Sequence, residues 1–313
     1  MPDAGGSQDN DLGLSGLSHL VIQVSDVARA AAFYSDVLGL EASAASWPGS
    51  AEALALASGG GQHLVLSPAA ELTDLRETGV HHAFAVSPAQ REKAAAALAA
   101  RDAEVFDYAE DPPDEAKDRF YFLDLDGNRI QLVTRPRAGA DDAPRLDHTA
   151  VQVADILWAE RFYTEVLGFT PVHRVGWNTA DYARAQLWAD GKEDMAPGTR
   201  RLDKRYSSIV NRRMVPRVNM QVYFACGGGV FGVYLANRHF QEPPEEAVLG
   251  VPRTAFRVTE DGLARARERL EAAGWRLEGP VAHAAGRPIA ASLYLRDPGG
   301  NFIELATAAE AAP

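Results

Sequence analysis

The chain has 313 residues, with 31 Lys and Arg against 43 Asp and Glu, a formal net charge of −12, and 46% hydrophobic residues. This length is typical of two domains that each bury a core, and the acidic balance disfavours a nucleic-acid partner, which selects a basic surface. A single cysteine, Cys226, excludes an internal disulfide framework, and no apolar run reaches the roughly 20 residues that span a bilayer. We therefore expect a cytoplasmic protein with neither a nucleic-acid nor a membrane partner; a homo-oligomer stays open.

The acidic excess lies wholly in the first half of the chain. Residues 1–143 carry 10 Lys and Arg against 23 Asp and Glu, whereas residues 144–313 carry 21 against 20. The total charge therefore says little about a ligand of the second half. Residues 1–16, rich in Gly, Asp and Ser, predict a disordered tail rather than a signal peptide.

A repeat relates the two halves. The segment His19-Leu-Val-Ile-Gln-Val-Ser-Asp26 is followed by Phe33-Tyr34 and Val37-Leu38-Gly39. The segment His148-Thr-Ala-Val-Gln-Val-Ala-Asp155 is followed by Phe162-Tyr163 and Val166-Leu167-Gly168, always with an offset of 129. Because the offset is the same for all of these matches, the two halves are predicted to be two copies of one architecture.

A second pair of matches divides each half again. The run Ala83-Phe-Ala-Val86 matches Ala255-Phe-Arg-Val258 at an offset of 172. The run Asp124-Leu-Asp-Gly-Asn-Arg-Ile-Gln-Leu132 matches Asp297-Pro-Gly-Gly-Asn-Phe-Ile-Glu-Leu305 at an offset of 173. The change of offset places about 43 extra residues in the second half, and residues 181–218 are the predicted insert.

Each half therefore contains two smaller units of one strand, one helix and about three further strands. Alternating apolar residues predict the strands, and a Gly-Asn turn feeds the last strand of the second unit in each half. Amphipathic stretches predict the helices. The predicted helices run from Ala28 to Leu38, from Pro88 to Arg101, from Ile156 to Leu167 and from Glu260 to Ala273.

These motifs resemble the vicinal oxygen chelate superfamily, which includes glyoxalase I, bleomycin and fosfomycin resistance proteins, and extradiol ring-cleavage dioxygenases. The resemblance implies an α+β fold in which four βαβββ units pair into two vicinal-oxygen-chelate domains, each a mixed, curled sheet that forms a funnel. We expect an N-terminal domain at 17–136 and a C-terminal domain at 145–308. This arrangement is similar to that of the extradiol dioxygenases, where the metal lies in the second domain.

The resemblance also implies ligand positions, on the first strand of a unit and on the strand after the Gly-Asn turn. In the C-terminal half these are His148 and Glu304, with Arg253 at the position between them and Tyr234 at the fourth. Arginine has no lone pair for a metal, so Arg253 replaces an expected His ligand. Either it ends metal binding by pairing with Glu304, or another histidine completes the site; Arg253 and Tyr234 are predicted to contact substrate.

The N-terminal half offers an alternative set. The same positions there hold His19, Val65, His81 and Gln131, and two imidazoles with an amide could bind a divalent ion. In either half, iron(II) or manganese(II) is the metal that the resemblance favours, and a metal-free protein stays open.

An extradiol-like signature follows in the last unit. It consists of His283, then Tyr294 before Asp297-Pro-Gly-Gly300, then Glu304. The resemblance assigns His283 and Tyr294 to hydrogen bonds with substrate oxygens, and His239 to acid–base catalysis. The alternatives are a turn-capping role for Tyr294 and a surface role for His239.

Three functions remain open at this point. The first is a metal-dependent ring-cleavage dioxygenase acting on a small oxygenated aromatic. The second is a metal-free binding protein of the bleomycin-resistance type, and the third is a lyase or isomerase of the glyoxalase type. The insert at 181–218, rich in Arg and Lys, is either a lid or pocket wall for an anionic or aromatic, oxygen-rich ligand, or a solvated loop or dimer contact.

Overall fold

The computed structural model describes residues 11–44, 46–48, 51–73, 75, 80–106, 119–135, 143–153, 155–175, 221–227, 229–235 and 247–309. His239 and the insert at 181–218 lie outside these residues, so the roles expected for them stay predictions. Within the described residues, no helix is long and apolar enough to cross a membrane.

The described residues form four units in chain order. Unit 1 comprises β1 (Gly16–Val24), α1 (Val27–Leu38), β2 (Glu41–Ala42), β3 (Leu54–Ser58), the short helix η1 (Gly59–Gly61) and β4 (Gln62–Pro68). Unit 2 comprises β5 (His82–Val86), α2 (Pro88–Ala99), β6 (Val105–Phe106), β7 (Arg119–Leu123) and β8 (Arg129–Thr134). Unit 3 comprises β9 (Arg145–Val153), α4 (Ile156–Arg161) with its π-helical continuation η2 (Phe162–Val166), β10 (Pro171–Val175), β11 (Gln221–Cys226) and β12 (Gly229–Leu235). Unit 4 comprises β13 (Arg253–Val258), α7 (Glu260–Ala272), β14 (Glu278–Ala282), β15 (Ile289–Arg296) and β16 (Phe302–Ala308).

The four predicted helices are confirmed, and each begins at a side-chain cap. Asp26 and Asp155 accept the backbone N–H three residues on, and Ser87 and Thr259 do the same for α2 and α7. Such caps satisfy N–H groups that lack a partner inside the helix. The repeated Asp at the end of the first strand therefore has a structural role.

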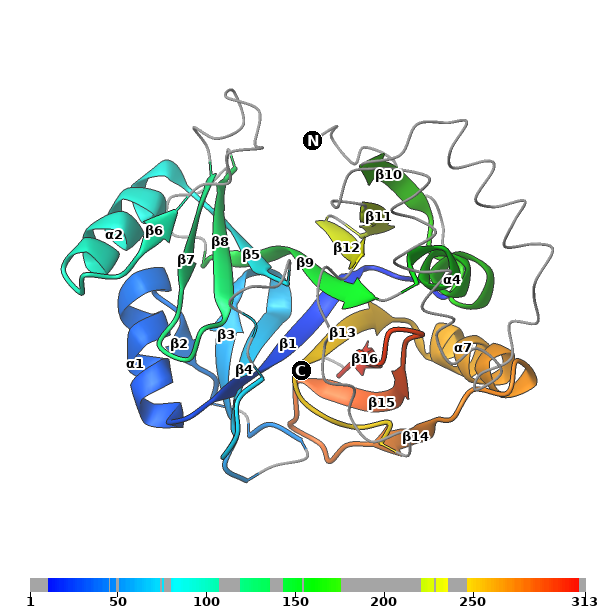
Figure 1. Ribbon diagram of the computed structural model, residues 1–313. Coiled ribbons are helices and arrows are strands. Elements are labelled where there is room, and N and C mark those ends of the chain that lie inside the picture. The colour runs from blue at the N-terminus through cyan, green and yellow to red at the C-terminus, as the bar shows by residue number, and fades with distance from the viewer. Residues whose placement is uncertain are drawn as a thin grey trace.

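The strands form two eight-stranded sheets in the described part of the chain. The first, sheet A, has the order β14-β15-β16-β13-β1-β4-β3-β2, and the second, sheet B, has the order β10-β11-β12-β9-β5-β8-β7-β6. Sheet A thus joins unit 1 to unit 4 through antiparallel β1 and β13. Sheet B joins unit 2 to unit 3 through β5 and β9. In Figure 1 the blue β1 runs beside the yellow β13, from the opposite end of the sequence.

This pairing differs from the expectation that consecutive units share a sheet. The sequence repeat shows that units exist, but it carries no information on which strand edge meets which. Two strands pair at the centre of a sheet only where their edges fit together. Here β1 pairs with β13 and not with β5. Any site on a sheet surface therefore draws residues from both halves of the chain.

Consecutive units are held together by the repeated motif residues. The Tyr34 hydroxyl donates to the Asp124 carboxylate at 2.8 Å, and the Asn128 amide donates to the Gln23 carbonyl at 3.0 Å. The second half repeats both contacts, with Tyr163 donating to Asp297 at 2.9 Å and Asn301 donating to the Gln152 carbonyl at 2.9 Å. The motifs therefore fasten unit 1 to unit 2 and unit 3 to unit 4.

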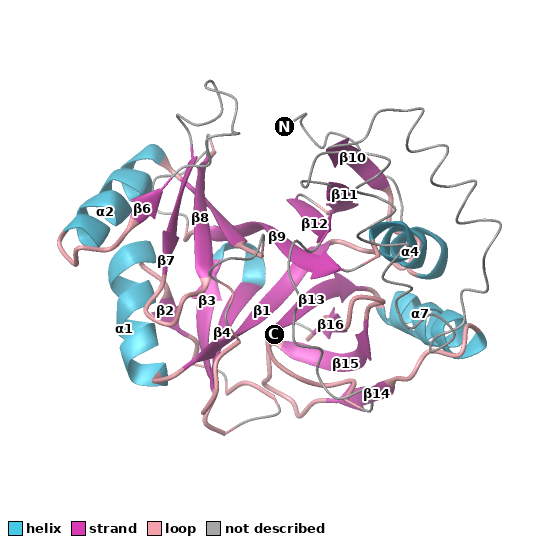
Figure 2. Cartoon of the chain, in the orientation of Figure 1, coloured by secondary structure: helices cyan, strands magenta, loops and turns pink. Residues whose placement is uncertain are grey.

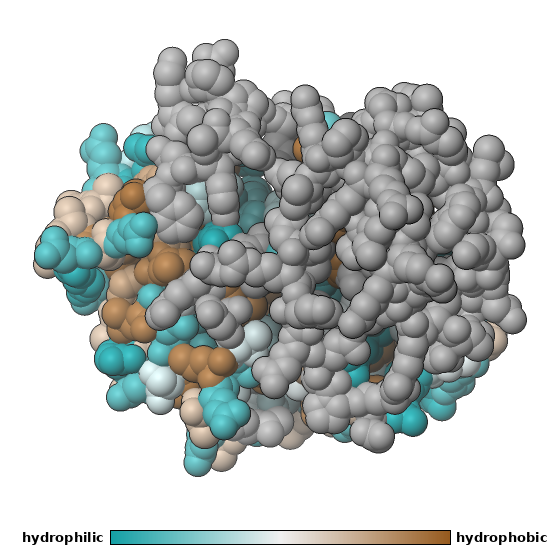
Figure 3. Space-filling model, in the orientation of Figure 1, coloured by the Kyte–Doolittle hydropathy of each residue, from teal (hydrophilic) through white to brown (hydrophobic). Residues whose placement is uncertain are grey.

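The main core lies between the sheets and the helices that cover their outer sides. Figure 2 shows α1 and α2 at one end of the molecule, α4 and α7 at the other, and the strands between them. Tyr34 and Tyr163 are fully buried in this core, as expected for helix-to-sheet packing. Exposed large apolar side chains are scattered over different elements (Leu72, Val105, Leu125, Val172, Leu249 and Val281), and Figure 3 shows polar and apolar atoms interspersed on the α1–α2 side. Such scatter is normal for a protein surface.

Candidate metal centre

The inner faces of the two sheets carry equivalent positions. In sheet B, Ala83 pairs with His148 on one side and with Gln131 on the other. In sheet A, Ala255 pairs in the same way with His19 and with Glu304. Because the register is the same, His81, His148 and Gln131 correspond to Arg253, His19 and Glu304.

Sheet B brings two histidines together. The Nε2 atoms of His81 and His148 lie 3.2 Å apart, and both residues are buried at the centre of the sheet. Gln131 lies on β8 and is 1% exposed, and its Oε1 has no hydrogen-bond partner among the residues that the structure describes. A buried acceptor without a donor is costly, so this oxygen indicates a missing ligand.

The orientation of His148 is set by a carboxylate. Its Nδ1 lies 2.9 Å from Asp147 Oδ2, and Arg135 donates to the same carboxylate from Nε and Nη2, both at 3.3 Å. Burial acts to raise the pKa of Asp147, but the hydrogen bonds and charges of His148 and Arg135 hold that pKa far below its usual range. An ionised Asp147 accepts a hydrogen bond from Nδ1–H, and in the neutral imidazole this arrangement leaves the Nε2 lone pair directed at His81.

A β-bulge in β9 brings the Asp147 carboxylate to the ring of His148, the next residue in the chain. The pairing of β5 with β9 shifts register between Ala83 and Phe84, where Asp147 is the extra residue. The pairing of β1 with β13 shifts at the equivalent point, next to Ser18. There Ser18 Oγ lies 3.2 Å from His19 Nδ1, so a neutral hydroxyl stands in sheet A where sheet B has a carboxylate.

The fourth position of sheet B has no side chain. In sheet A, Val65 pairs with Val21, and the equivalent pair in sheet B is Gly232 with Ala150. The prediction that Tyr234 occupies this position is wrong by two residues, since β12 meets β9 in a register that the sequence does not reveal. A Cβ at Gly232 would lie 3.2 Å from the Tyr223 ring and 3.3 Å from the Tyr234 ring.

Tyrosine rings surround the two histidines of sheet B. The His81 ring lies 5.7 Å from the Tyr121 ring and 5.8 Å from the Tyr234 ring. The hydroxyls of Tyr223 and Tyr234 are 2.9 Å apart. The His173 ring lies 6.0 Å from the Tyr223 ring. The inner face of sheet B is thus polar at its centre and aromatic around it.

Sheet A holds an ion-pair network at the equivalent place. Glu304 Oε2 accepts from Arg253 Nε at 2.7 Å and lies 3.1 Å from His19 Nε2. Its Oε1 accepts from Ser292 Oγ at 2.6 Å. Burial acts to raise the pKa of Glu304, but His19, Arg253 and Ser292 lower it to about 2. Of the two alternatives for Arg253, the structure shows the pairing with Glu304.

An indole covers this network. The Trp47 ring lies 4.5 Å from the His19 ring and 5.2 Å from the His63 ring, and it packs in a small apolar cluster with Val21 and Val65. Burial lowers the pKa of His63 to about 4. The centre of sheet A is therefore packed with protein.

His283 and Tyr294 lie beside this network and not beside His148. His283 Nε2 contacts Ser292 Oγ at 2.8 Å, and the Arg253 guanidinium lies over the Tyr294 ring at 5.3 Å. Burial lowers the pKa of His283 and raises that of Tyr294. Their expected contact with substrate stays a prediction, but Tyr294 lies on β15 of sheet A and His283 directly follows β14 of the same sheet.

Neither predicted metal set is assembled as a unit. His148 and Glu304 lie in different sheets, and so do His19 and the pair His81 and Gln131. Each set was drawn from one half of the sequence, whereas each sheet takes one unit from each half. His82 faces away from the site, where its Nδ1 contacts the Thr149 hydroxyl at 2.8 Å.

The residues of sheet B fit a divalent metal ion. Two nitrogens bound to one ion at about 2.1 Å each lie about 3 Å apart at a right angle, close to the separation of the two Nε2 atoms. No three side chains drawn from His, Cys, Asp and Glu converge within the described ranges, so the third donor would be the unpartnered Gln131 oxygen. The residues of sheet A do not fit, because Arg253 already neutralises Glu304.

The chain belongs to the glyoxalase/bleomycin resistance protein/dioxygenase superfamily. The model of that family matches residues 16–132 and 145–305, which cover both halves of the repeat. The resemblance to the vicinal oxygen chelate proteins is therefore confirmed, and so is the α+β fold built from two such domains.

Solved structures share this fold at low identity. A putative dioxygenase from Bacillus subtilis is 15% identical, with 94% of this chain and 86% of that chain covered and a TM-score of 0.62. Glyoxalase I from Zea mays is 14% identical, with 93% and 92% covered and a TM-score of 0.57. No curated protein matches the sequence significantly. At these identities the likeness concerns the fold alone.

Proposed function

We propose that the chain is a metal-dependent enzyme of this superfamily, in which His81, His148 and Gln131 hold one divalent cation in sheet B. The observation that carries the proposal is the 3.2 Å approach of the two Nε2 atoms, together with the buried Gln131 oxygen, which lies in the same register of the sheet and has no partner among the described residues. This site replaces both sets expected from the sequence. Iron(II) or manganese(II) remains the proposed metal.

The donor set suits a substrate that binds as an anion through two oxygens. Two imidazoles and an amide are neutral, so a bound dication keeps its full charge for the substrate. Gly232 supplies no donor atom at the fourth position, where the Tyr223 and Tyr234 rings lie close to it, so further donors would come from the substrate. In this role a bound metal supplies Lewis acidity and, as iron(II), redox chemistry with oxygen.

The surroundings favour a small aromatic substrate. Tyr121, Tyr223 and Tyr234 present ring faces and edges around the proposed centre, and aromatic pairs prefer such offset or edge arrangements. The Tyr223 hydroxyl donates to Gln221 Oε1 and shares a hydrogen bond with the Tyr234 hydroxyl, so a substrate oxygen would accept from this pair by replacing one of these contacts. Tyr234 thus keeps its predicted role in substrate binding.

A ring-cleavage dioxygenase fits this site better than an isomerase of the glyoxalase type. An isomerase must move a proton between substrate carbons and needs a base at the metal. Among the described residues of the site, Gln131 accepts no proton, and Asp147 is engaged by His148 and Arg135. We therefore propose an extradiol-like oxygenation of a small dihydroxylated aromatic.

Metal content tests the site directly. The purified chain, reconstituted anaerobically with iron(II) or manganese(II) and desalted, is expected to hold one ion per chain by elemental analysis. His81→Ala and His148→Ala are expected to lose it. His19→Ala, the equivalent of His148→Ala in sheet A, is the matched control and is expected to keep the ion. If the wild type holds no metal, the alternative of a metal-free binding protein replaces the enzyme.

Oxygen uptake tests the reaction. The iron(II)-loaded chain is expected to consume oxygen when a catechol is added, with the yellow absorbance of a ring-opened product. Tyr234→Phe is expected to raise KM while the metal content stays at one. A metal-loaded protein that binds catechol without oxygen uptake would contradict the proposed dioxygenase activity but not the proposed metal site.

A further inference from the structure

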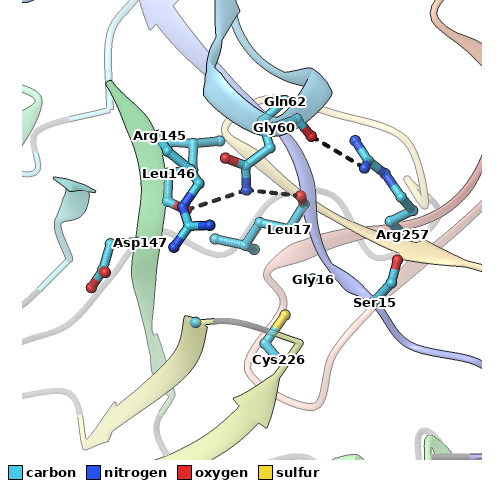
Figure 4. Close-up of a pocket in the computed structure, with 11 residues that line it drawn as sticks. Ser15, Gly16, Leu17, Gly60, Gln62, Arg145, Leu146, Asp147, Cys226 and Arg257 are labelled. Carbon is cyan, nitrogen blue, oxygen red and sulfur yellow. Dashed lines mark hydrogen bonds between the residues drawn. The ribbon is translucent and has the colours of Figure 1, made fainter. Parts of the chain in front are cut away.

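A small cavity lies at the junction of the two sheets, outside the proposed metal centre. Its volume is about 110 Å3, several times the roughly 10–15 Å3 that one water needs. It is lined by the start of β1, the start of β4, the bulged end of β9, the β11–β12 turn and Arg257 of β13 (Figure 4). It therefore draws on three of the four units.

Gln62 presents a buried acceptor at this cavity. Its side-chain Nε2 donates to the carbonyls of Leu17 at 3.1 Å and Leu146 at 3.2 Å. These two acceptors fix the amide orientation, because a flipped amide would set its oxygen against both carbonyls. Gln62 is 8% exposed, and its Oε1 has no hydrogen-bond partner in the described part of the chain. Figure 4 shows this oxygen turned to the Arg145 side of the pocket.

Two guanidinium groups give the cavity a positive charge. Arg257 is held by the carbonyls of Gly60 at 3.3 Å and Gly61 at 2.7 Å. The Arg145 side chain makes no hydrogen bond or ion pair with a described residue. Asp147 also lines the cavity, but its carboxylate is occupied by His148 and Arg135. The charge of the two arginines is thus not neutralised by a lining residue.

We propose that this junction cavity binds a small oxyanion that also carries a hydroxyl group. The arginines supply the charge that attracts the oxyanion, and the Gln62 oxygen accepts from its hydroxyl. Hydrogen phosphate and short hydroxycarboxylates have this chemistry, whereas sulfate and acetate lack the hydroxyl at neutral pH. The site is independent of the proposed catalysis, although Arg145 lies only three residues before His148.

Isothermal titration of the full chain tests the site, with phosphate against sulfate and glycolate against acetate. The titrations use both the wild type and His148→Ala, so that an anion bound to a metal is not counted. Phosphate or glycolate is expected to bind. The matched anion without a hydroxyl group, sulfate or acetate, is expected to bind several-fold more weakly. The arm that binds, phosphate or glycolate, distinguishes the two sources of the anion.

Arg145→Ala is expected to weaken binding about tenfold or more, since it removes a charge-assisted contact. Because the Arg145 side chain is exposed, the melting temperature of the Arg145→Ala variant should equal that of the wild type. Arg276→Ala, an exposed arginine outside the cavity, is the matched control and should bind as the wild type does. Absence of binding by both phosphate and glycolate, equal binding of sulfate, or wild-type binding by Arg145→Ala would each overturn the proposal.

Discussion

His81 Nε2 and His148 Nε2 lie 3.2 Å apart across the centre of sheet B, although 67 residues separate them in the chain. One comes from the first half of the repeat and the other from the second. The proposed metal centre therefore exists only where β5 pairs with β9. In sheet A the same geometry brings Arg253 and His19 to Glu304, where they form an ion-pair network.

Asp147→Asn is expected to weaken metal binding by about 10- to 100-fold, because an amide no longer fixes the His148 tautomer or supports its basicity. Competition with a chelator of known affinity measures the change. Ser18→Ala removes the equivalent contact of sheet A and should leave metal affinity unaltered. Equal affinities for Asp147→Asn and wild type would show that His148 is no ligand.

Arg253→His is expected to create a second metal site in sheet A. The substitution would set an imidazole beside His19 and Glu304, and two imidazoles with one carboxylate form a common iron(II) donor set. Elemental analysis should find two ions per chain in place of one. Combined with His148→Ala, the variant should hold one ion, whereas His148→Ala alone holds none. No gain of metal in either background would contradict the equivalence of the two sheets.

Glu304 is expected to make the fold acid-sensitive. Its pKa is lowered to about 2 from an ordinary value of 4.5, so its contribution to stability is complete above pH 4.5. The contribution is lost as pH falls from 4.5 to 2, since only the unfolded chain then takes up the proton. The loss amounts to about 3 kcal/mol.

Urea unfolding of wild type and Glu304→Gln between pH 6 and pH 3 measures this dependence. The variant should be less stable at pH 6, because Arg253 and His19 lose their partner. The difference between the two proteins should shrink towards pH 3. A constant difference over this range would mean that Glu304 is not the titrating group.

Tyr34→Phe and Tyr163→Phe are each expected to lower the free energy of unfolding by about 1–3 kcal/mol. Each removes the donor to a buried carboxylate, Asp124 or Asp297, and leaves an acceptor without its partner. Urea denaturation measures both. Metal content should be unchanged in either variant, because these contacts lie on the helix side of the sheets. If the free energy of unfolding falls by less than about 0.5 kcal/mol in both variants, these hydrogen bonds do not have the structural role assigned to them.

Much of the local structure was predictable because it depends on neighbours in the sequence. Asp26, Ser87 and Asp155 begin helices where the sequence places them. The buried positions of Tyr34 and Tyr163 follow from the apolar face of a helix. Of the ligand candidates, His19, Gln131, His148 and Glu304 were also correctly placed on first or last strands, and His81 directly precedes β5. Their grouping was not, because two halves with the same motifs offer two ways to pair their sheets.

The sequence by itself determined the repeat, the superfamily, the helices and the type of residue at each ligand position, all of which follow from patterns within short segments. Only the tertiary structure decided that β1 pairs with β13 and β5 with β9. It likewise decided that Gly232, and not Tyr234, faces the fourth ligand position. The physical reason is that strand pairing and register are set by edges that meet in space, and a one-residue shift changes which side chain faces the site.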